Sequence, residues 1–101
     1  MIKVYLAVVN PDTGYYPTPA EFPNGYRLNA EVDVEDHELE RAFELTNSTD
    51  QLWWKKTPVT PVAPFHRRSS NVGDVFVLSN GDKMLCKASG WKKLDDMTIA
   101  E

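Results

Sequence analysis

The sequence has few of the residues that build metal and disulfide sites. It contains one cysteine, Cys86, and two histidines, His37 and His66, in 101 residues. A single cysteine excludes an internal disulfide framework and a zinc site made of several cysteines. The histidines lie 29 positions apart, and no loop has calcium-binding spacing. We therefore predict no bound metal.

Long apolar runs and phosphate-binding motifs are also lacking. The longest apolar run, Val4 to Val9, has six residues, whereas a membrane-spanning helix needs about 20. The run stops at Asn10-Pro11 without a small-residue cleavage site, which favours a strand over a signal peptide. Neither a GxGxxG motif nor a P-loop is present, so no cofactor is predicted. We expect a cytoplasmic protein without membrane contact.

The apolar residues that are present suffice for one core, which predicts a single domain over residues 1–101. Residues 2–9 are apolar at both alternations, which predicts a central strand covered on both faces. The loop 10–25 holds four prolines and two glycines, and we expect it to fold back over the core or to form a partner surface. Residues 26–34 alternate, which predicts a half-buried strand. Its inward row would be Tyr26, Leu28, Ala30, Val32 and Val34.

One helix is predicted, over residues 36–47. Asp36 is a favourable N-cap residue, and Asn47 can end the helix in a left-handed conformation. One face carries the apolar or small residues at helical spacing, which are Leu39, Ala42, Phe43 and Thr46.

The last third of the chain predicts a β-meander. Asn80-Gly81 between two apolar runs is typical of a type I′ hairpin turn, and a second turn at Ser89-Gly90 leads into residues 91–94. Its core candidates are Val75, Val77, Met84, Cys86 and Trp91. The fold class is thus α+β, with a mixed or antiparallel sheet, one packed helix and a C-terminal meander. Prolines at positions 58, 61 and 64 predict a stiff polyproline spacer before the meander.

Charge is distributed unevenly along the chain. Residues 1–52 hold ten acidic and three basic side chains (net −7), and residues 53–101 hold five acidic and eight basic ones (net +3). The acidic side chains would line the solvent side of a strand and a helix, or would steer a basic partner. The candidate partner-binding residues of this acidic segment are Glu31, Asp33, Glu35, Asp36, Glu38, Glu40 and Glu44.

The second half combines basic and aromatic residues, as single-strand nucleic-acid binders do. The candidate contacts are Trp53, Trp54, Lys55, Lys56, His66, Arg67 and Arg68. Against this alternative, the chain as a whole is acidic, with a pI of about 5.1, whereas nucleic-acid-binding domains are strongly basic.

A Ser-His-Asp reading of His66, Ser69 or Ser70, and Asp74 lacks a nucleophile elbow and an oxyanion hole. We interpret these residues as turn chemistry, in which Ser70 and Asp74 bond nearby backbone N–H groups. No catalytic residue is predicted.

A helix followed by "RRSSNVGDV", a strand, a glycine turn, a second strand and "GWKKL" resembles the YodL-like domains of phages and conjugative elements. The resemblance covers roughly residues 36–94, and Asn71 departs from it, since a small hydroxyl residue is expected there. The matching residues are Leu39, Glu40, Phe43, Arg68, Ser69, Val72, Gly73, Asp74, Val75, Gly81, Gly90, Trp91 and Leu94.

The resemblance implies a mobile-element origin and a compact α+β fold, and it implies no catalytic activity. We expect a non-enzymatic binding protein that occupies the surface of a host protein, in counter-defence or host takeover, inside the host cytoplasm. Its contact surface would combine the acidic segment with the aromatic-rich loops. The alternatives are a nucleic-acid-binding module and a structural virion or assembly protein, and a homo-oligomer stays open.

Overall fold

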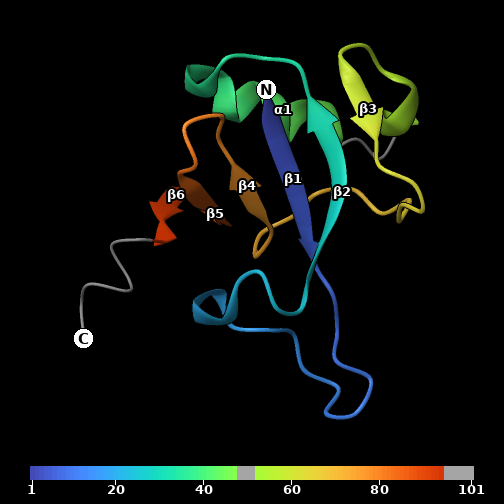
Figure 1. Cartoon of the computed structure of the whole chain (residues 1–101), viewed down its shortest axis with the longest axis vertical. Helices are drawn as coiled ribbons and strands as arrows, with labels where there is room; N and C mark the ends of the chain where they lie inside the picture. The colour runs from blue at the N-terminus through green and yellow to red at the C-terminus, as the bar shows by residue number, and fades with distance from the viewer. Residues whose placement is uncertain (48–51, 95–101) are drawn as a thin grey trace.

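A computed structural model describes residues 1–47 and 52–94 of the chain. Its main feature is one six-stranded antiparallel sheet with the strand order β3-β2-β1-β4-β5-β6 (Figure 1). Among these described residues, one α-helix and three 3₁₀ turns accompany the sheet, and the α+β prediction is confirmed. The elements are β1 (Ile2–Ala7), η1 (Pro19–Glu21), β2 (Tyr26–Val32), η2 (Asp36–Glu38), α1 (Leu39–Thr46), η3 (Trp53–Lys55), β3 (Val59–Pro61), β4 (Val75–Val77), β5 (Lys83–Lys87) and β6 (Gly90–Lys93).

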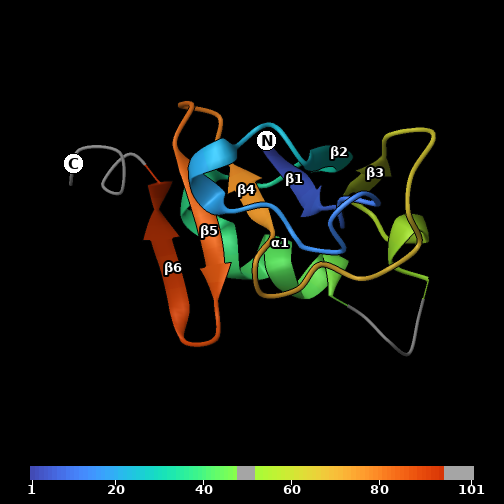
Figure 2. The same ribbon diagram turned by 90° about the horizontal axis from the view of Figure 1, so that it is seen from below.

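β1 lies in the middle of the sheet, between β2 and β4, as its apolar sequence predicts. Ile2, Val4 and Leu6 are buried in the main core, on the face that α1 covers (Figure 2). On the opposite face Lys3 is exposed and Tyr5 is half-buried. The second face of β1 is therefore only partly covered, which is less than the sequence pattern predicts.

The helix begins later than predicted. A 3₁₀ turn, η2, precedes α1, and the N-caps of the two are Glu35 and Glu38 rather than Asp36. Asp36 instead accepts hydrogen bonds from the Ser79 backbone N–H at 2.8 Å and the Ser79 hydroxyl at 2.7 Å. Asn47 ends the helix at φ −107°, so the predicted left-handed end is wrong.

β2 contains a β-bulge at Asn29, which breaks the predicted alternation. Val4 pairs with Ala30, but the next residue of β1, Tyr5, pairs with Leu28. The extra residue turns the remainder of β2 over, because side chains alternate strictly along a regular strand. The single inward row predicted for residues 26–34 is therefore wrong. Ala30, Val32 and Val34 pack in the main core, whereas Tyr26 packs on the other face of the sheet.

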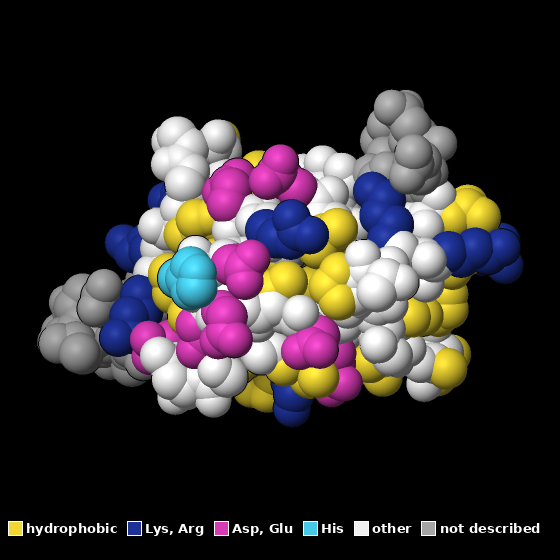
Figure 3. Space-filling view, turned by 90° about the horizontal axis from the view of Figure 1, so that it is seen from above, with side chains coloured by type: hydrophobic (Ala, Val, Ile, Leu, Met, Phe, Trp, Pro, Cys, Tyr) yellow, Lys and Arg dark blue, Asp and Glu magenta, His cyan; other side chains and the backbone are white. Residues whose placement is uncertain are grey.

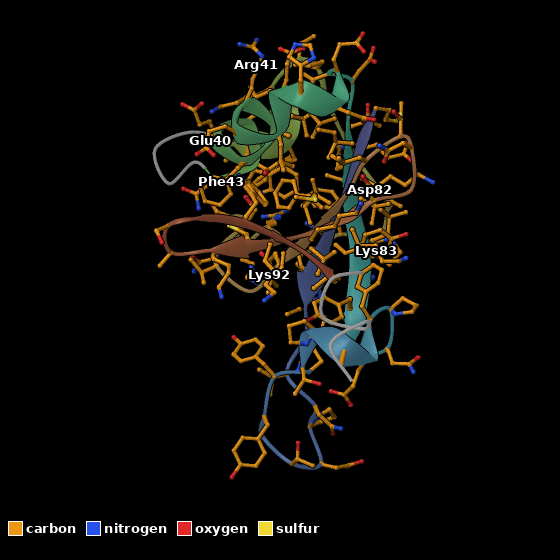
Figure 4. The ribbon with its side chains drawn as sticks, turned by 90° about the vertical axis from the view of Figure 1, so that its left-hand side faces the viewer. Glu40, Arg41, Phe43, Asp82, Lys83 and Lys92 are labelled. Atoms are coloured by element: carbon orange, nitrogen blue, oxygen red, sulfur yellow. The ribbon has the colours of Figure 1, made fainter. Side chains whose placement is uncertain are left out.

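The predicted meander is confirmed as β4, β5 and β6. The turn between β4 and β5 differs in type, because Gly81 alone has a positive φ, of 94°. Its N–H donates to the Leu78 carbonyl, and the Leu78 N–H donates to the Asp82 carbonyl. These bonds close a three-residue loop rather than a type I′ turn. In Figure 4, Phe43 lies between α1 and this hairpin, and Lys92 lies on the side away from the helix.

The proline-rich segment is part of the sheet rather than a free spacer. Val59–Pro61 forms the edge strand β3 and pairs with β2. An edge position suits proline, because its missing N–H leaves no gap in the ladder there. The polyproline prediction is thus wrong for these three residues.

The loop between β1 and β2 covers part of the second face of the sheet. Phe22 packs against Tyr5 and Tyr26, with ring centroids 5.0 and 5.1 Å apart. By contrast, Tyr15 and Tyr16 are 75% and 63% exposed. The expectation that this loop folds back over the core is confirmed for Phe22, while the two tyrosines stand out from it.

α1 and the end of β2 that leads to it lie at one end of the long axis, and the loop between β1 and β2 extends from the other (Figure 1). Among the described residues, no helix has the length and apolarity that crossing a membrane requires.

Candidate functional site

The acidic segment, residues 31–44, lies at the α1 end of the molecule (Figure 3). Three of its carboxylates contact neighbouring groups of the same chain. Asp36 binds Ser79, and Glu40 accepts a hydrogen bond from the Trp91 indole N–H at 3.1 Å. Glu38 accepts one from the Glu35 N–H at 3.2 Å. In Figure 3 acidic side chains on this face alternate with basic and apolar ones.

These contacts give part of the acidic segment a structural role. The hydrogen bonds from the Ser79 N–H and then from its hydroxyl lower the pKa of Asp36. Asp36 thereby ties the approach to α1 to the turn between β4 and β5. Asp33, Glu35 and Glu44 are exposed, and these side chains are available to solvent or to a partner.

The aromatic residues of the second half form a packed cluster. Trp53 is buried, and its indole N–H donates to the Arg67 carbonyl at 2.9 Å. Trp54 is half-buried and packs against Trp53 and Phe65, with centroids 5.6 and 5.8 Å apart. The Arg67 guanidinium lies 5.5 Å from the centre of the Trp54 ring. Because the two rings pack against each other and against Phe65, neither tryptophan is fully exposed, and Arg67 lies over the outer ring, that of Trp54.

The backbone of His66 is fixed to the bulge in β2. The buried amide of Asn29 accepts from the His66 N–H at 2.7 Å and donates to the His66 carbonyl at 3.0 Å. The Asn29 carbonyl also accepts from the Val62 N–H at 3.0 Å. At the bulge the Asn29 side chain thus holds the backbone of His66, and the Asn29 backbone carbonyl holds Val62.

Arg68 and Asp74 form a bidentate ion pair. Both Arg68 terminal nitrogens lie 2.9 Å from the Asp74 carboxylate oxygens. Asp74 is 1% exposed and also accepts from the Ala7 N–H at 2.9 Å and the Asn71 N–H at 2.8 Å. Arg68 in turn donates to the carbonyls of Ala7 and Ser69. The pair therefore joins the end of β1 to the start of β4.

This ion pair changes the interpretation of the basic cluster and of the serine-rich turn. The Asp74 hydrogen bonds raise the pKa of Arg68, while partial burial opposes them. The Arg68 charge is compensated within the fold, whereas the ion pairs between described residues include neither Lys55 nor Arg67. Ser70, predicted to bond nearby N–H groups, instead lies with its hydroxyl 2.8 Å from that of Thr46. The turn prediction holds for Asp74 only through its Asn71 bond.

Beside the ion pair lies a cavity of about 630 Å³. Its walls come from the end of β1, the loop between β1 and β2, the turn before β4 and the end of β5. It was missed by sequence reasoning, because its walls come from four separated segments. Its lining residues are Ala7, Tyr16, Pro17, Pro19, Tyr26, Arg68, Asn71, Val72, Gly73, Asp74, Leu85, Cys86, Lys87 and Ala88.

Exposed apolar side chains gather around this cavity. Tyr16 lines it and also lines two adjoining hollows. Val72, on the cavity wall, is 56% exposed. We call this region the aromatic end, and its exposed apolar side chains are Val8, Val9, Tyr15, Tyr16 and Val72.

Local hydrogen bonds hold the tyrosine-bearing loop in shape. The Asn10 N–H donates to the Tyr15 carbonyl at 2.9 Å, and the Gly14 N–H donates to the Asn10 carbonyl at 2.8 Å. Further along, the Glu21 carboxylate accepts from the Thr18 N–H at 2.7 Å. That bond, followed by one from the Thr18 hydroxyl, lowers the pKa of Glu21. The loop therefore presents Tyr15 on a preformed turn.

Two titratable groups that line the cavity, Cys86 and Tyr26, have raised pKa values. Burial raises the pKa of the Cys86 thiol to about 11, with smaller contributions from Asp74 and Glu40. Burial likewise raises the pKa of Tyr26. At neutral pH both groups keep their protons, so Cys86 is a poor nucleophile. Among the residues that the structure describes, no group of three or more His, Cys, Asp and Glu side chains is placed to hold a metal ion.

No family model, no curated protein and no solved structure matches this chain.

Proposed function

We propose that this chain is a non-enzymatic binding protein that occupies the surface of a partner protein through its aromatic end. One observation carries the proposal. Of the seven large apolar side chains that are exposed among the described residues, five line the hollows that meet at Tyr16. Single exposed apolar residues are ordinary on a protein surface, whereas a contiguous group of them is typical of an interaction site.

With the mobile-element origin that the resemblance implies, the proposed partner is a host protein, and the proposed role is counter-defence or host takeover. Tyrosine supports such a role, because it brings a large contact area at a low cost in side-chain entropy. The preformed turn under Tyr15 supports it as well, since a rigid loop loses little freedom on binding.

We limit the proposed contact surface to one end of the molecule. The acidic segment and the loop between β1 and β2 lie at opposite ends of the molecule (Figure 1), so they do not form one patch. We place the contact at the aromatic end, because several carboxylates of the acidic segment are engaged in contacts within the fold. Partner binding by the acidic segment stays a prediction.

Two variants separate these surfaces in a pull-down from host lysate. One replaces Tyr15 and Tyr16 with serine, and the matched control replaces the exposed acids Asp33, Glu35 and Glu44 with their amides. We expect the first variant to lose the partner and the second to keep it, at unchanged thermal stability. Loss in the acidic variant alone, or retention in both, would contradict the proposal.

Nucleic-acid binding remains the alternative, since Lys55 is exposed and the exposed Arg67 lies over the Trp54 ring. A salt titration of binding to single-stranded DNA distinguishes it. Binding whose affinity falls steeply with salt, and which Lys55→Gln and Arg67→Gln weaken, would favour this alternative.

A further inference from the structure

The cavity beside Arg68 and Asp74 has the size of a site for one anchoring side chain. Its volume of about 630 Å³ lies within the range of ligand pockets, which is roughly 300–1,000 Å³. Tyr16, Tyr26 and Leu85 supply apolar surface on different walls. An indole or phenyl ring with its adjoining backbone fits a space of this size, and such rings dominate the energetics of protein interfaces.

Two charged groups that line the cavity, Arg68 and Asp74, compensate each other. Asp74 accepts four hydrogen bonds, two of them from Arg68. Each terminal nitrogen of Arg68 also donates to a backbone carbonyl, of Ala7 or Ser69. The ion pair is therefore satisfied within the fold, and it closes the cavity wall as a neutral unit.

Lys87 is the remaining charged residue that lines the cavity. It ends β5 and is exposed, and the ion pairs among the described residues do not include it. Lys87 therefore places one positive side chain at the rim of the cavity, although the chain as a whole carries a net charge of −4. An anionic group next to the anchoring ring complements this rim.

We infer that the cavity binds an aromatic side chain of the partner protein that is flanked by a carboxylate, with the ring between Tyr16 and Tyr26 and the carboxylate beside Lys87. This inference rests on the proposed function and names the chemistry of the partner segment. The size of the cavity, its apolar walls and its single uncompensated lining charge together carry it.

Two small probes of the same shape, one charged and one neutral, test the inference on the full chain. N-acetyl-L-tryptophan carries a carboxylate, and N-acetyl-L-tryptophanamide is its neutral counterpart. Titration is followed by the backbone amide NMR signals of Val72, Gly73, Lys87 and Ala88. We expect saturable shifts of these signals with a Kd on the order of 1 mM. The acid should bind about two- to five-fold more tightly than the amide, as for an exposed ion pair.

Paired variants locate the effect. Lys87→Gln should abolish the preference for the acid while keeping amide binding, whereas Lys55→Gln, in η3, should leave the preference intact. Tyr16→Ala should weaken both probes, and Tyr15→Ala should weaken neither, because Tyr15 is similarly exposed but does not line this cavity. All four side chains are exposed, so the variants should fold like the parent chain.

The inference is overturned if the amide signals around the cavity do not saturate, or if acid and amide bind equally well to the parent chain. It is also overturned if Lys55→Gln removes the preference and Lys87→Gln does not. Failure of the proposed function looks different, since the tyrosine-to-serine variant would then keep its partner in the pull-down. A lost partner with no probe binding would leave the proposed function standing and remove only the anchor.

Discussion

The acidic end, residues 31–44, and the aromatic end of this molecule differ in what their side chains contact. At the acidic end, Asp36 and Glu40 bind Ser79 and Trp91 of the same chain. At the aromatic end a buried carboxylate is paired within the fold, and five apolar side chains are exposed. Asp74 is buried beneath its ion pair with Arg68, whereas Tyr16 is 63% exposed.

The difference shows why charge density is a weak guide to a binding surface. Acidic side chains around a short helix have local hydrogen-bond donors to bind, in the first turn of the helix and in the neighbouring turn of the sheet. Exposed tyrosines on a loop that already buries Phe22 lack such a reason. A surface on which large apolar side chains stay exposed to water is the better indication of a binding site.

The largest expected effect comes from breaking the ion pair under the aromatic end. Asp74→Asn removes the charge that compensates Arg68 and turns an amide N–H₂ toward donors at Ala7 or Asn71. We expect a loss of about 3 kcal/mol in the free energy of unfolding, at the lower end of the range for buried pairs because Arg68 is 39% exposed. Urea denaturation measures it.

The matched control at the acidic end is Asp33→Asn. Asp33 is exposed, so we expect its free energy of unfolding to stay within about 0.5 kcal/mol of the parent value. Equal losses in the two variants would show that the ends are not built differently, and would remove the structural role assigned to the Arg68–Asp74 pair.

A smaller effect is expected from the glycines of the tyrosine-bearing loop. Gly14 and Gly25 both have positive φ, of 76° and 83°. A Cβ on Gly25 would lie 2.6 Å from the Pro17 Cβ, whereas a Cβ on Gly14 meets nothing within 4 Å. Gly14→Ala should therefore cost about 1 kcal/mol for the left-handed conformation alone. Gly25→Ala should cost roughly 1–2 kcal/mol more, because Pro17 has to move.

The same pair sharpens the account of the cavity, since Pro17 lines it. Gly25→Ala should shift the amide NMR signals of Val72 and Gly73, across the cavity, and Gly14→Ala should leave them in place. Identical stabilities and spectra for the two variants would show that the contact between Gly25 and Pro17 does not shape the aromatic end.

Local features of the fold could be predicted from sequence, and features that join distant segments could not. The β4–β5 hairpin follows from turn residues between apolar runs, and the central place of β1 follows from its apolar pattern. The bulge at Asn29 has no local signal, because it is stabilised by His66, 37 positions away. In the sequence, Arg68 and Asp74 indicate only a local turn. Their joint contact with Ala7 could not be predicted, because Ala7 comes from another strand.

The same limit applies to the candidate site. Tyr15 and Tyr16 could be noticed as aromatic residues in a long proline-rich loop. The position of Tyr16 around the same cavity as Val72 and Lys87 depends on how that loop folds over the sheet. Alternating patterns describe residues within one strand, so they do not report which loops meet at its end.

The smallest expected effect concerns two exposed carboxylates, one at each end. Hydrogen bonds from Ser79 lower the pKa of Asp36 below its usual 3.8, and those from Thr18 lower the pKa of Glu21 below its usual 4.5. A lowered pKa in the folded state means that the stabilisation is fully present above the usual value and is lost as the pH falls through the lowered one. NMR titration of the Ser79 and Thr18 amides should therefore give midpoints below 3.8 and 4.5.

Ser79→Ala provides the control, because it removes the hydroxyl bond to Asp36 and keeps the backbone one. In this variant the titration midpoint of Asp36 should rise part of the way toward 3.8, while that of Glu21 stays unchanged. Matching behaviour of Asp36 and Glu21 in the parent chain would show that local capping is common to both ends, so the contrast between them rests on exposed apolar surface. If Asp36 alone titrates at its usual value, its hydrogen bonds to Ser79 are absent in solution. The structural role assigned to Asp36 would then be wrong.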